Sequence, residues 1–313
     1  MKTIISKTHT LGFSAAKNLV LILCGLLFSL NIFASSINIV AAENFYGAIA
    51  SEIGGSKVAV QSILSNPSSD PHLFATSFAT SKSISNAQVI IYNGSNYDSW
   101  IEPLLKSNKK KNTVIINVAD LMQIKSGANP HLWYKPDTST ILAKYLTGVF
   151  TKLDKPSADI FKKNLALFLK NNQLVQDKIS QLKTQFKNTP ITATEPVFGY
   201  MADALGLKMY GLNLQWKIMN GTEPTPKMFI AYKNLIINKH VWLVLYNSQV
   251  ISPTTTSILT LAKQNHIPVV GVTETMPAKY SSFNDWMMAE LNNLEAALKL
   301  TNLKTAESNK GNK

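Results

Sequence analysis

The sequence contains no arginine. All 31 basic residues are lysines, which outnumber the 18 acidic residues and give a net charge of +13. Nucleic-acid-binding proteins depend on the bidentate and stacking contacts of arginine, and the lysines here are spread along the chain rather than clustered. The composition therefore indicates a generally basic, solvated surface and argues against a nucleic-acid partner.

Cysteine is nearly absent as well. The single Cys24 lies in an apolar run, residues 19–34, which follows three lysines and is shorter than the ~20 residues of a membrane span. We expect residues 1–34 to be a signal peptide that is cleaved after Ala34 and exports the chain to the periplasm. An uncleaved anchor and a lipid on Cys24 are less favoured, because Leu23 is larger than the residue expected before a lipidated cysteine. The exported chain then has no thiol for a disulfide, a metal ligand or a nucleophile.

The exported part alternates short runs rich in isoleucine and valine with helix-like segments, as an α/β protein does. In the first half, the expected strands are residues 37–41, 58–64, 89–92 and 114–117, and the expected helices are 45–53, 80–87, 97–105 and 138–153. In the second half, the expected strands are 191–194, 208–212, 241–246 and 268–273, and the expected helices are 197–205, 226–237, 254–264 and 283–300. This alternation predicts one parallel sheet, covered by helices, in each half.

One segment interrupts the alternation. Residues 157–187 contain no glycine or proline and carry an apolar residue every three or four positions. This pattern predicts one amphipathic helix roughly 45 Å long, although a coiled-coil or oligomerisation helix would show the same stripe. The predicted fold class is α/β, with two parallel-sheet (β/α)4 lobes joined by a single long rigid helix. The predicted boundaries are an N-terminal lobe at 35–154, the linking helix at 155–188, a C-terminal lobe at 189–303 and a disordered tail at 304–313.

Two of the five histidines stand in near-identical settings. His72 lies in Asp70-Pro71-His72-Leu73-Phe74, and His131 lies in Asn129-Pro130-His131-Leu132-Trp133. The proline before each histidine holds the backbone extended, so both imidazoles are expected on rigid loops. Each loop follows a predicted strand of the first half, and ligands of open α/β sheets bind beyond the carboxyl ends of the strands. His72 and His131 are therefore candidate metal ligands.

Two glutamates occupy the corresponding places in the second half. Glu195 and Glu274 each come directly after a predicted strand. Two candidates from each half would line a cleft between the lobes from both sides. Either glutamate could instead cap a helix, because Glu195 precedes Pro196 and Glu274 lies shortly before Pro277. Asn247 also follows a predicted strand, and whether it contributes to the site is left open.

The donor set limits the choice of metal. Two imidazoles offer nitrogen donors, and two carboxylates neutralise the charge of a divalent ion. The set lacks thiolates, so it does not favour Cu(I). It suits Zn(II), and carboxylates that bind through both oxygens leave room for the higher coordination numbers of Mn(II) or Fe(II). The donor types alone do not decide between zinc and manganese.

Six short motifs are spread over most of the exported chain. They are Asp70-Pro71-His72, Tyr92-Asn93-Gly94, Asn129-Pro130-His131-Leu132-Trp133, Glu195-Pro196-Val197-Phe198-Gly199-Tyr200, Gly221-Thr222-Glu223-Pro224-Thr225-Pro226, and Ile267-Pro268-Val269-Val270 leading to Thr273-Glu274. In combination they resemble the metal-binding branch of the solute-binding proteins that serve ABC importers, the zinc/manganese-type group called cluster A-I. The resemblance implies two α/β lobes joined by one long rigid helix, and metal ligands at His72, His131, Glu195 and Glu274.

The chain also departs from this group. Many zinc-specific relatives have a histidine-rich loop between the first two ligands, yet no histidine occurs between Leu73 and Pro130. Glu195 stands where relatives have His or Glu, and Glu274 where they commonly have Asp. Lys135 stands where relatives often have an acid. The missing loop and Glu195 weaken an assignment to zinc alone.

We therefore expect an exported, monomeric receptor, not an enzyme, that captures a divalent metal ion between its lobes and delivers it to the permease of an ABC-type importer. Zinc is favoured ahead of manganese, and the ion is transported rather than a resident cofactor. One alternative is a secreted metal-dependent hydrolase, although the sequence has no His-Glu-x-x-His motif. The other is a haem- or siderophore-binding protein of the same architecture.

Overall fold

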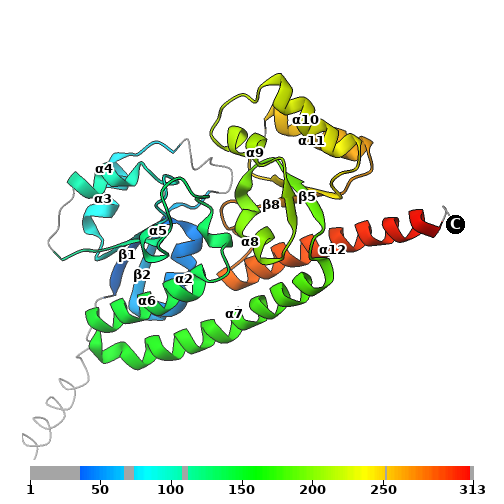
Figure 1. The fold of residues 1–313 in the computed structure, drawn as a ribbon. Helices are drawn as coiled ribbons and strands as arrows, with labels where there is room; N and C mark the ends of the chain where they lie inside the picture. The colour runs from blue at the N-terminus through cyan, green and yellow to red at the C-terminus, as the bar shows by residue number, and fades with distance from the viewer. Residues whose placement is uncertain (1–35, 67–73, 108–111, 251, 311–313) are drawn as a thin grey trace, which may run out of the picture. The chain divides into compact units, whose positions relative to one another are not determined.

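The structure is a computed structural model that describes residues 36–66, 74–107, 112–250 and 252–310; for residues 302–310 it describes the backbone alone. Residues Ser36–Lys313 form one compact unit, drawn as a ribbon in Figure 1. None of the helices in the described ranges is long and apolar enough to span a membrane. The predicted signal peptide, residues 1–34, lies outside these ranges.

The first half of the chain forms a parallel four-stranded sheet in the order β2-β1-β3-β4. Its strands are β1 (Ile37–Glu43), β2 (Val58–Leu64), β3 (Val89–Tyr92) and β4 (Val114–Asn117). The helices between and after them are α2 (Asn44–Gly54), α3 (Phe78–Asn86), α4 (Ile101–Ser107), α5 (Val118–Leu121) and α6 (Thr138–Leu153). The central strands β1 and β3 are almost wholly buried, which explains why they read as continuous apolar runs.

The second half repeats this topology in a second parallel sheet, with the order β6-β5-β7-β8. Its strands are β5 (Pro190–Ala193), β6 (Lys208–Tyr210), β7 (Leu243–Asn247) and β8 (Val269–Val272). Its helices are α8 (Gly199–Ala204), α9 (Leu212–Met219), α10 (Pro226–Ile237), α11 (Pro253–Gln264) and α12 (Phe283–Lys310). The predicted α/β class with two parallel sheets is confirmed. We call the two sheets with their helices the N-lobe (residues 36–154) and the C-lobe (residues 189–301).

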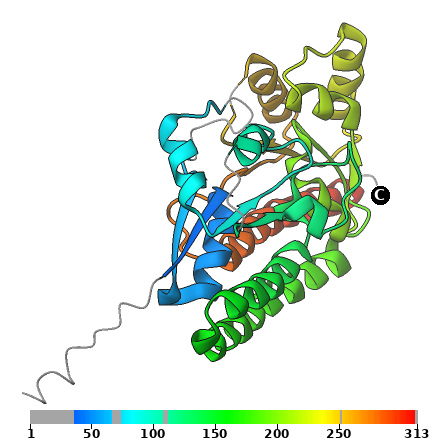
Figure 2. The same ribbon diagram turned by 90° about the vertical axis from the view of Figure 1, so that its left-hand side faces the viewer.

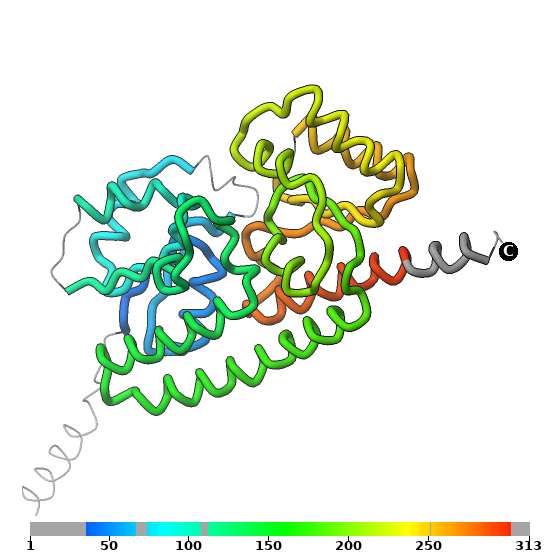
Figure 3. The backbone as a smooth tube through the Cα atoms, viewed as in Figure 1, coloured from blue at the N-terminus to red at the C-terminus, as the bar shows by residue number. Residues whose placement is uncertain are grey.

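The helix α7 (Ala158–Phe186) connects the two sheets. It contacts α2 and α6 of the N-lobe and α12 of the C-lobe, as Figures 2 and 3 show. Asn172 is a polar residue on the buried face of α7, and it donates from Nδ2 to Ser139 Oγ (3.1 Å) and Asn284 Oδ1 (2.9 Å). The polar residue therefore bonds α7 to both lobes, which an apolar side chain at this position could not do.

The last helix is longer than the sequence predicts. We expected a helix at 283–300 and a disordered tail from residue 304, but α12 extends to Lys310. Residues 301–310 contain no glycine or proline, and the first such residue is Gly311, so no helix-stopping signal occurs earlier. A polar composition alone was too weak a reason to end the helix.

Glu52 bonds the N-lobe to the start of α12 and gives the first testable prediction. Its Oε1 accepts a hydrogen bond from the Phe283 N–H (3.1 Å), and burial raises the pKa of Glu52 to about 7, with a smaller contribution from Asp285. A carboxyl group whose pKa is raised in the folded state stabilises the fold fully below its ordinary pKa near 4.5 and loses that contribution as pH rises through about 7.

The variant Glu52→Gln should therefore lose less stability than the wild type between pH 5 and pH 8. The expected difference is about 1–2 kcal/mol, after a discount for the partial exposure of this side chain to solvent. Urea unfolding of both proteins at the two pH values measures it. Parallel pH profiles for the two proteins would contradict the assignment.

Candidate metal site

The candidate ligand His131 lies in the loop between α5 and α6, just before the 3₁₀ helix η3 (Leu132–Tyr134). Its side chain is fully buried, and its ring packs edge-on against Trp133 at 5.2 Å between centroids. Nδ1 lies 2.6 Å from Asn129 Oδ1, which fixes the ring orientation. Nε2 points in the other direction, toward Glu274 of the C-lobe, 3.5 Å from its Oε1.

Glu274 follows β8 and is 1% exposed. Its second carboxylate oxygen, Oε2, accepts a hydrogen bond from Asn247 Nδ2 (2.7 Å), and its backbone N–H donates to Gln249 Oε1 (2.8 Å). Asn247, whose role the sequence left open, therefore orients this carboxylate. No helix begins at Glu274, because the next one starts at Phe283, so the alternative of a helix cap does not apply.

Glu195 follows β5 and is 5% exposed. It stands at the N-cap position of the 3₁₀ helix η5 (Pro196–Phe198), but its side chain makes no capping hydrogen bond. The Glu195 carboxylate therefore does not cap this helix either. Its carboxylate is buried beyond the carboxyl end of a C-lobe strand, the edge of a parallel sheet at which ligands bind.

The structure brings together some of the four predicted ligands. His131 and Glu274 form a close pair, whereas within the described ranges no three His, Cys, Asp or Glu side chains gather closely enough to hold an ion. Among the described residues, Glu195 therefore does not join His131 and Glu274 in a group of three close ligands. His72 lies in residues 67–73, outside the described residues.

N-lobe side chains bond to the backbone on both sides of Glu274. Tyr134 Oη donates to the Thr273 carbonyl (2.6 Å), one residue before it. Asn44 donates from Nδ2 to the Met276 carbonyl (2.7 Å) and accepts from the Met276 N–H at Oδ1 (3.1 Å), two residues after it. These bonds fix the segment that carries Glu274 relative to the loop that carries His131.

Tyr97 lies at the same place between the lobes. Its ring centroid is 6.1 Å from that of His131 and 4.9 Å from that of Trp133. Burial raises the pKa of Tyr97 well above its usual value, and the neighbouring Glu274 carboxylate raises it further. The phenol therefore stays neutral and can donate to that carboxylate.

Two buried acids, Glu43 and Asp98, lie next to each other in the N-lobe, and the sequence analysis did not predict this pair. Glu43 ends β1 and is fully buried beside Asp98. Burial and the Asp98 carboxylate raise the pKa of Glu43 well above its usual range, while burial raises that of Asp98 to about 6. Asp98 also accepts from the N–H groups of Asn93 (2.6 Å) and Gly94 (2.8 Å).

Glu43 therefore favours its neutral form beside the Asp98 carboxylate. Asp98 holds the 93–98 turn through its bonds to the Asn93 and Gly94 N–H groups. The sequence does place a glutamate at the end of a buried strand. Because Glu43 directly precedes a helix, it was not recognised as a buried residue.

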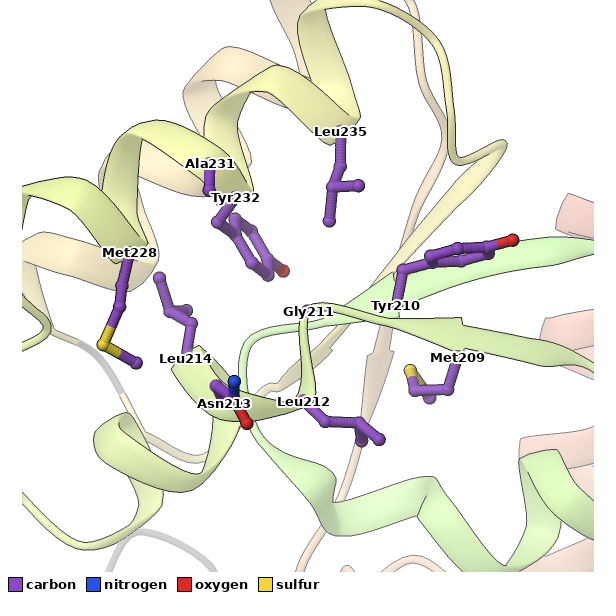
Figure 4. A pocket seen from close by; sticks show the side chains of 10 residues that line it. All are labelled: Met209, Tyr210, Gly211, Leu212, Asn213, Leu214, Met228, Ala231, Tyr232 and Leu235. Carbon is purple, nitrogen blue, oxygen red and sulfur yellow. The ribbon is translucent and has the colours of Figure 1, made fainter.

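The pocket in Figure 4 is a different feature. It has a volume of about 400 Å³ and lies in the C-lobe between β6, α9 and α10. Its lining contains no histidine and no carboxylate, and Met228, Leu214 and Tyr232 contribute apolar surface to it. It therefore lacks the donors that a metal ion needs.

A buried imidazole and a buried carboxylate thus face each other between two parallel-sheet α/β lobes. Residues 39–297 match the family described as ZnuA, zinc-uptake complex component A, periplasmic, and the chain belongs to this family. The prediction of a metal receptor of an ABC importer is confirmed.

The sequence is similar to several substrate-binding lipoproteins of metal ABC transporters. The manganese ABC transporter substrate-binding lipoprotein PsaA of Streptococcus pneumoniae is 25% identical over 258 residues, which cover 75% of this chain and 79% of the relative. The metal ABC transporter substrate-binding lipoprotein FimA of Streptococcus parasanguinis is 25% identical over 254 residues, with the same coverage of both chains.

Solved structures share the fold. The periplasmic zinc-binding protein TroA of Treponema pallidum superposes with a TM-score of 0.72 at 13% identity, covering 84% of this chain and 99% of that one. A manganese-bound periplasmic metal-binding protein of Candidatus Liberibacter asiaticus gives a TM-score of 0.66 at 18% identity, covering 83% and 99%. These likenesses support the two-lobed architecture.

The relatives correct one prediction. We expected a lipid anchor to be unlikely, but the relatives are named as lipoproteins, which contradicts that expectation. That expectation was based on the large side chain of Leu23, which directly precedes Cys24. Acylation depends on the cysteine thiol and the export segment around it, so one neighbouring side chain was too little to exclude it.

Proposed function

We propose that this chain binds one divalent transition metal ion, zinc or manganese, through His72, His131, Glu195 and Glu274, and releases it to the permease of an ABC importer. The observation that carries the proposal is the separation of 3.5 Å between His131 Nε2 and Glu274 Oε1. Two ligand atoms at ~2.1 Å from a tetrahedral ion lie ~3.4 Å apart, so this pair is already spaced for coordination.

Binding then requires Glu195 to approach the His131–Glu274 pair. Pro196 and the short helix η5 hold the Glu195 backbone, so a small movement of this loop toward the N-lobe completes the site. Release follows from the reverse movement, since α7 contacts both lobes along its length and opposes a large hinge rotation. Acid weakens binding, because a proton competes with the metal for His131 Nε2.

The role of Glu195 gives a prediction about selectivity. Replacing Glu195 with histidine exchanges a hard oxygen donor, which can bind through two atoms, for a single imidazole nitrogen. The variant should lose Mn²⁺ affinity more than Zn²⁺ affinity, by about tenfold in the ratio, because manganese prefers oxygen ligands and a higher coordination number. Competitive titration of both ions into wild type and Glu195→His measures this, and an unchanged ratio would argue against Glu195 as a ligand.

We also propose that the protein acts as a monomer and has no enzymatic activity. A metallohydrolase needs an open coordination position and a general base. Two buried acidic groups of the N-lobe already have partners: Tyr97 lies beside Glu274, and Glu43 lies beside Asp98. Reproducible metal-dependent hydrolysis by the zinc-loaded protein, in a screen of ester, peptide and phosphate substrates, would contradict this part of the proposal.

A further inference from the structure

Asn129 has its amide orientation fixed by its neighbours. Oδ1 lies 3.1 Å from the His131 backbone N–H, a donor, and Nδ2 lies 2.7 Å from the Pro196 carbonyl oxygen, an acceptor. Oδ1 is therefore the acceptor in its 2.6 Å contact with His131 Nδ1, which must carry the proton. This tautomer leaves the Nε2 lone pair directed toward Glu274.

The same side chain reaches across the lobes. Pro196 directly follows Glu195, so Asn129 Nδ2 bonds the backbone next to the C-lobe ligand while Oδ1 orients the N-lobe ligand. Tyr200 Oη adds a bond in the reverse direction, donating to the Asn129 carbonyl (2.9 Å). Both Tyr200 and the Pro196 carbonyl belong to the segment that follows Glu195.

Gly199 is what allows this approach. A Cβ atom at residue 199 would lie 2.8 Å from Asn129 Nδ2, closer than real Cβ atoms come to their neighbours. Three hydrogen bonds hold the Asn129 amide, so it could yield only by giving up some of them. The absence of a side chain at Gly199 is thus part of the same arrangement.

We propose that Asn129 is a positioning residue that couples the two halves of the metal site. It sets Nε2 of His131 toward the ion and, through Pro196, fixes how far the Glu195 loop lies from that histidine. The inference rests on the proposed metal site. Metal–ligand distances vary by only about ±0.2 Å, so loss of the Asn129 bonds should weaken binding about 10–100-fold, as for other partners that orient metal ligands.

The test compares Zn²⁺ dissociation constants of the wild type, Asn129→Ala, Gly199→Ala and a matched control, Asn164→Ala. Asn164 likewise donates from Nδ2 to a backbone carbonyl, that of Ile53 (3.0 Å), but on α7 away from the ligands. We expect a loss of about 10–100-fold for Asn129→Ala and Gly199→Ala and no more than about threefold for the control. Equal losses in all three variants would overturn the proposal.

A second comparison isolates the coupling. Gly199→Ala displaces Nδ2 from Pro196 and should act through Glu195, so its effect should disappear when Glu195→Ala is already present. If the full effect persists in that background, the coupling is wrong. If Gly199→Ala fails to fold, Tyr200→Phe takes its place in the same comparison with and without Glu195→Ala. This variant removes the hydrogen bond from Tyr200 Oη to the Asn129 carbonyl.

The controls separate this inference from the metal site itself. If His131→Ala weakens Zn²⁺ binding but Asn129→Ala does not, the proposed function stands and the role of Asn129 fails. If His131→Ala has no effect, the proposed site fails, and the inference fails with it. The visible absorption of bound Co²⁺ gives an independent readout, because it should change in Asn129→Ala and remain that of the wild type in Asn164→Ala.

Discussion

Replacing His131 with alanine is expected to weaken Zn²⁺ binding about a hundredfold or more. Four-ligand zinc sites in proteins have apparent binding free energies of about 10–16 kcal/mol, so one ligand accounts for roughly 3 kcal/mol. His131 is fully buried, and its Nε2 faces Glu274, so alanine at this position removes a nitrogen donor from the proposed site. Isothermal titration of the metal-free protein with Zn²⁺ measures the loss.

The matched control is His240→Ala. His240 is exposed and precedes β7, at the end of the sheet opposite to the candidate ligands. It should bind Zn²⁺ with the affinity of the wild type. Equal affinities for wild type and His131→Ala would remove His131 from the site, whereas a loss in His240→Ala would point to a different binding place.

Replacing Trp286 with alanine is expected to destabilise the protein by about 3–5 kcal/mol, the range for removing a large aromatic side chain from a core. Trp286 lies in the first turns of α12, is fully buried and contacts the rings of Phe45 and Tyr134 in the N-lobe. Its Nε1 also donates to Thr273 Oγ1 (2.7 Å), next to Glu274. Phe45, Tyr134 and Trp286 therefore form one aromatic cluster shared by the two lobes, next to the segment that carries Glu274.

Urea unfolding measures this effect, with Trp216→Ala as the matched control. Trp216 lies on α9 of the C-lobe and is only partly buried. Its removal should cost less than half as much as removal of Trp286. If the two variants were equally stable, the contacts of Trp286 with the N-lobe rings would not stabilise the protein as predicted. The variant Trp286→Phe keeps a ring but removes the bond to Thr273, and it should fall between wild type and alanine.

Much of the fold could be predicted from the sequence because the buried strands are unambiguous. β2, β3 and β4 have the predicted bounds, since runs of Val and Ile between turn residues suit few other structures. The helices α6 and α10 also begin and end as predicted. Tertiary contacts do not oppose the local signals in these segments.

The misses come from turns that tertiary contacts define. Residues 208–212 were predicted as a strand, but β6 ends at Tyr210 and α9 begins at Leu212. Gly211 lies between them with a φ of 77°, and a Cβ there would lie 2.7 Å from the Tyr232 ring. The chain can turn and pass this ring only with glycine, a requirement that periodicity does not reveal.

A turn held by tertiary contacts also explains why α4 starts later in the sequence than predicted. A helix was predicted from residue 97, yet α4 starts at Ile101. The Asp98 carboxylate accepts from the N–H groups of Asn93 and Gly94, and Ser95 and Asn96 both have positive φ. The buried Asp98 carboxylate therefore holds a turn in a segment whose composition favours a helix.

The candidate site could be predicted in part for a geometric reason. Glu195 and Glu274 follow β5 and β8 of one parallel sheet, and the carboxyl ends of such strands lie at the same edge. His131 lies in the longer loop after β4 and α5 of the other sheet. The roles of Asn129 and Tyr97 could not be found in this way. Both act through contacts with residues that are distant in the sequence, which only the folded chain brings together.

Anomalous diffraction from crystals of the zinc-loaded protein, measured at the zinc absorption edge, locates the bound ion directly. We expect one strong peak between the lobes, ~2.0–2.2 Å from His131 Nε2 and from carboxylate oxygens of Glu274 and Glu195, with His72 as the fourth ligand. A principal peak elsewhere, or one between the lobes that touches neither His131 nor Glu274, would contradict the proposed site.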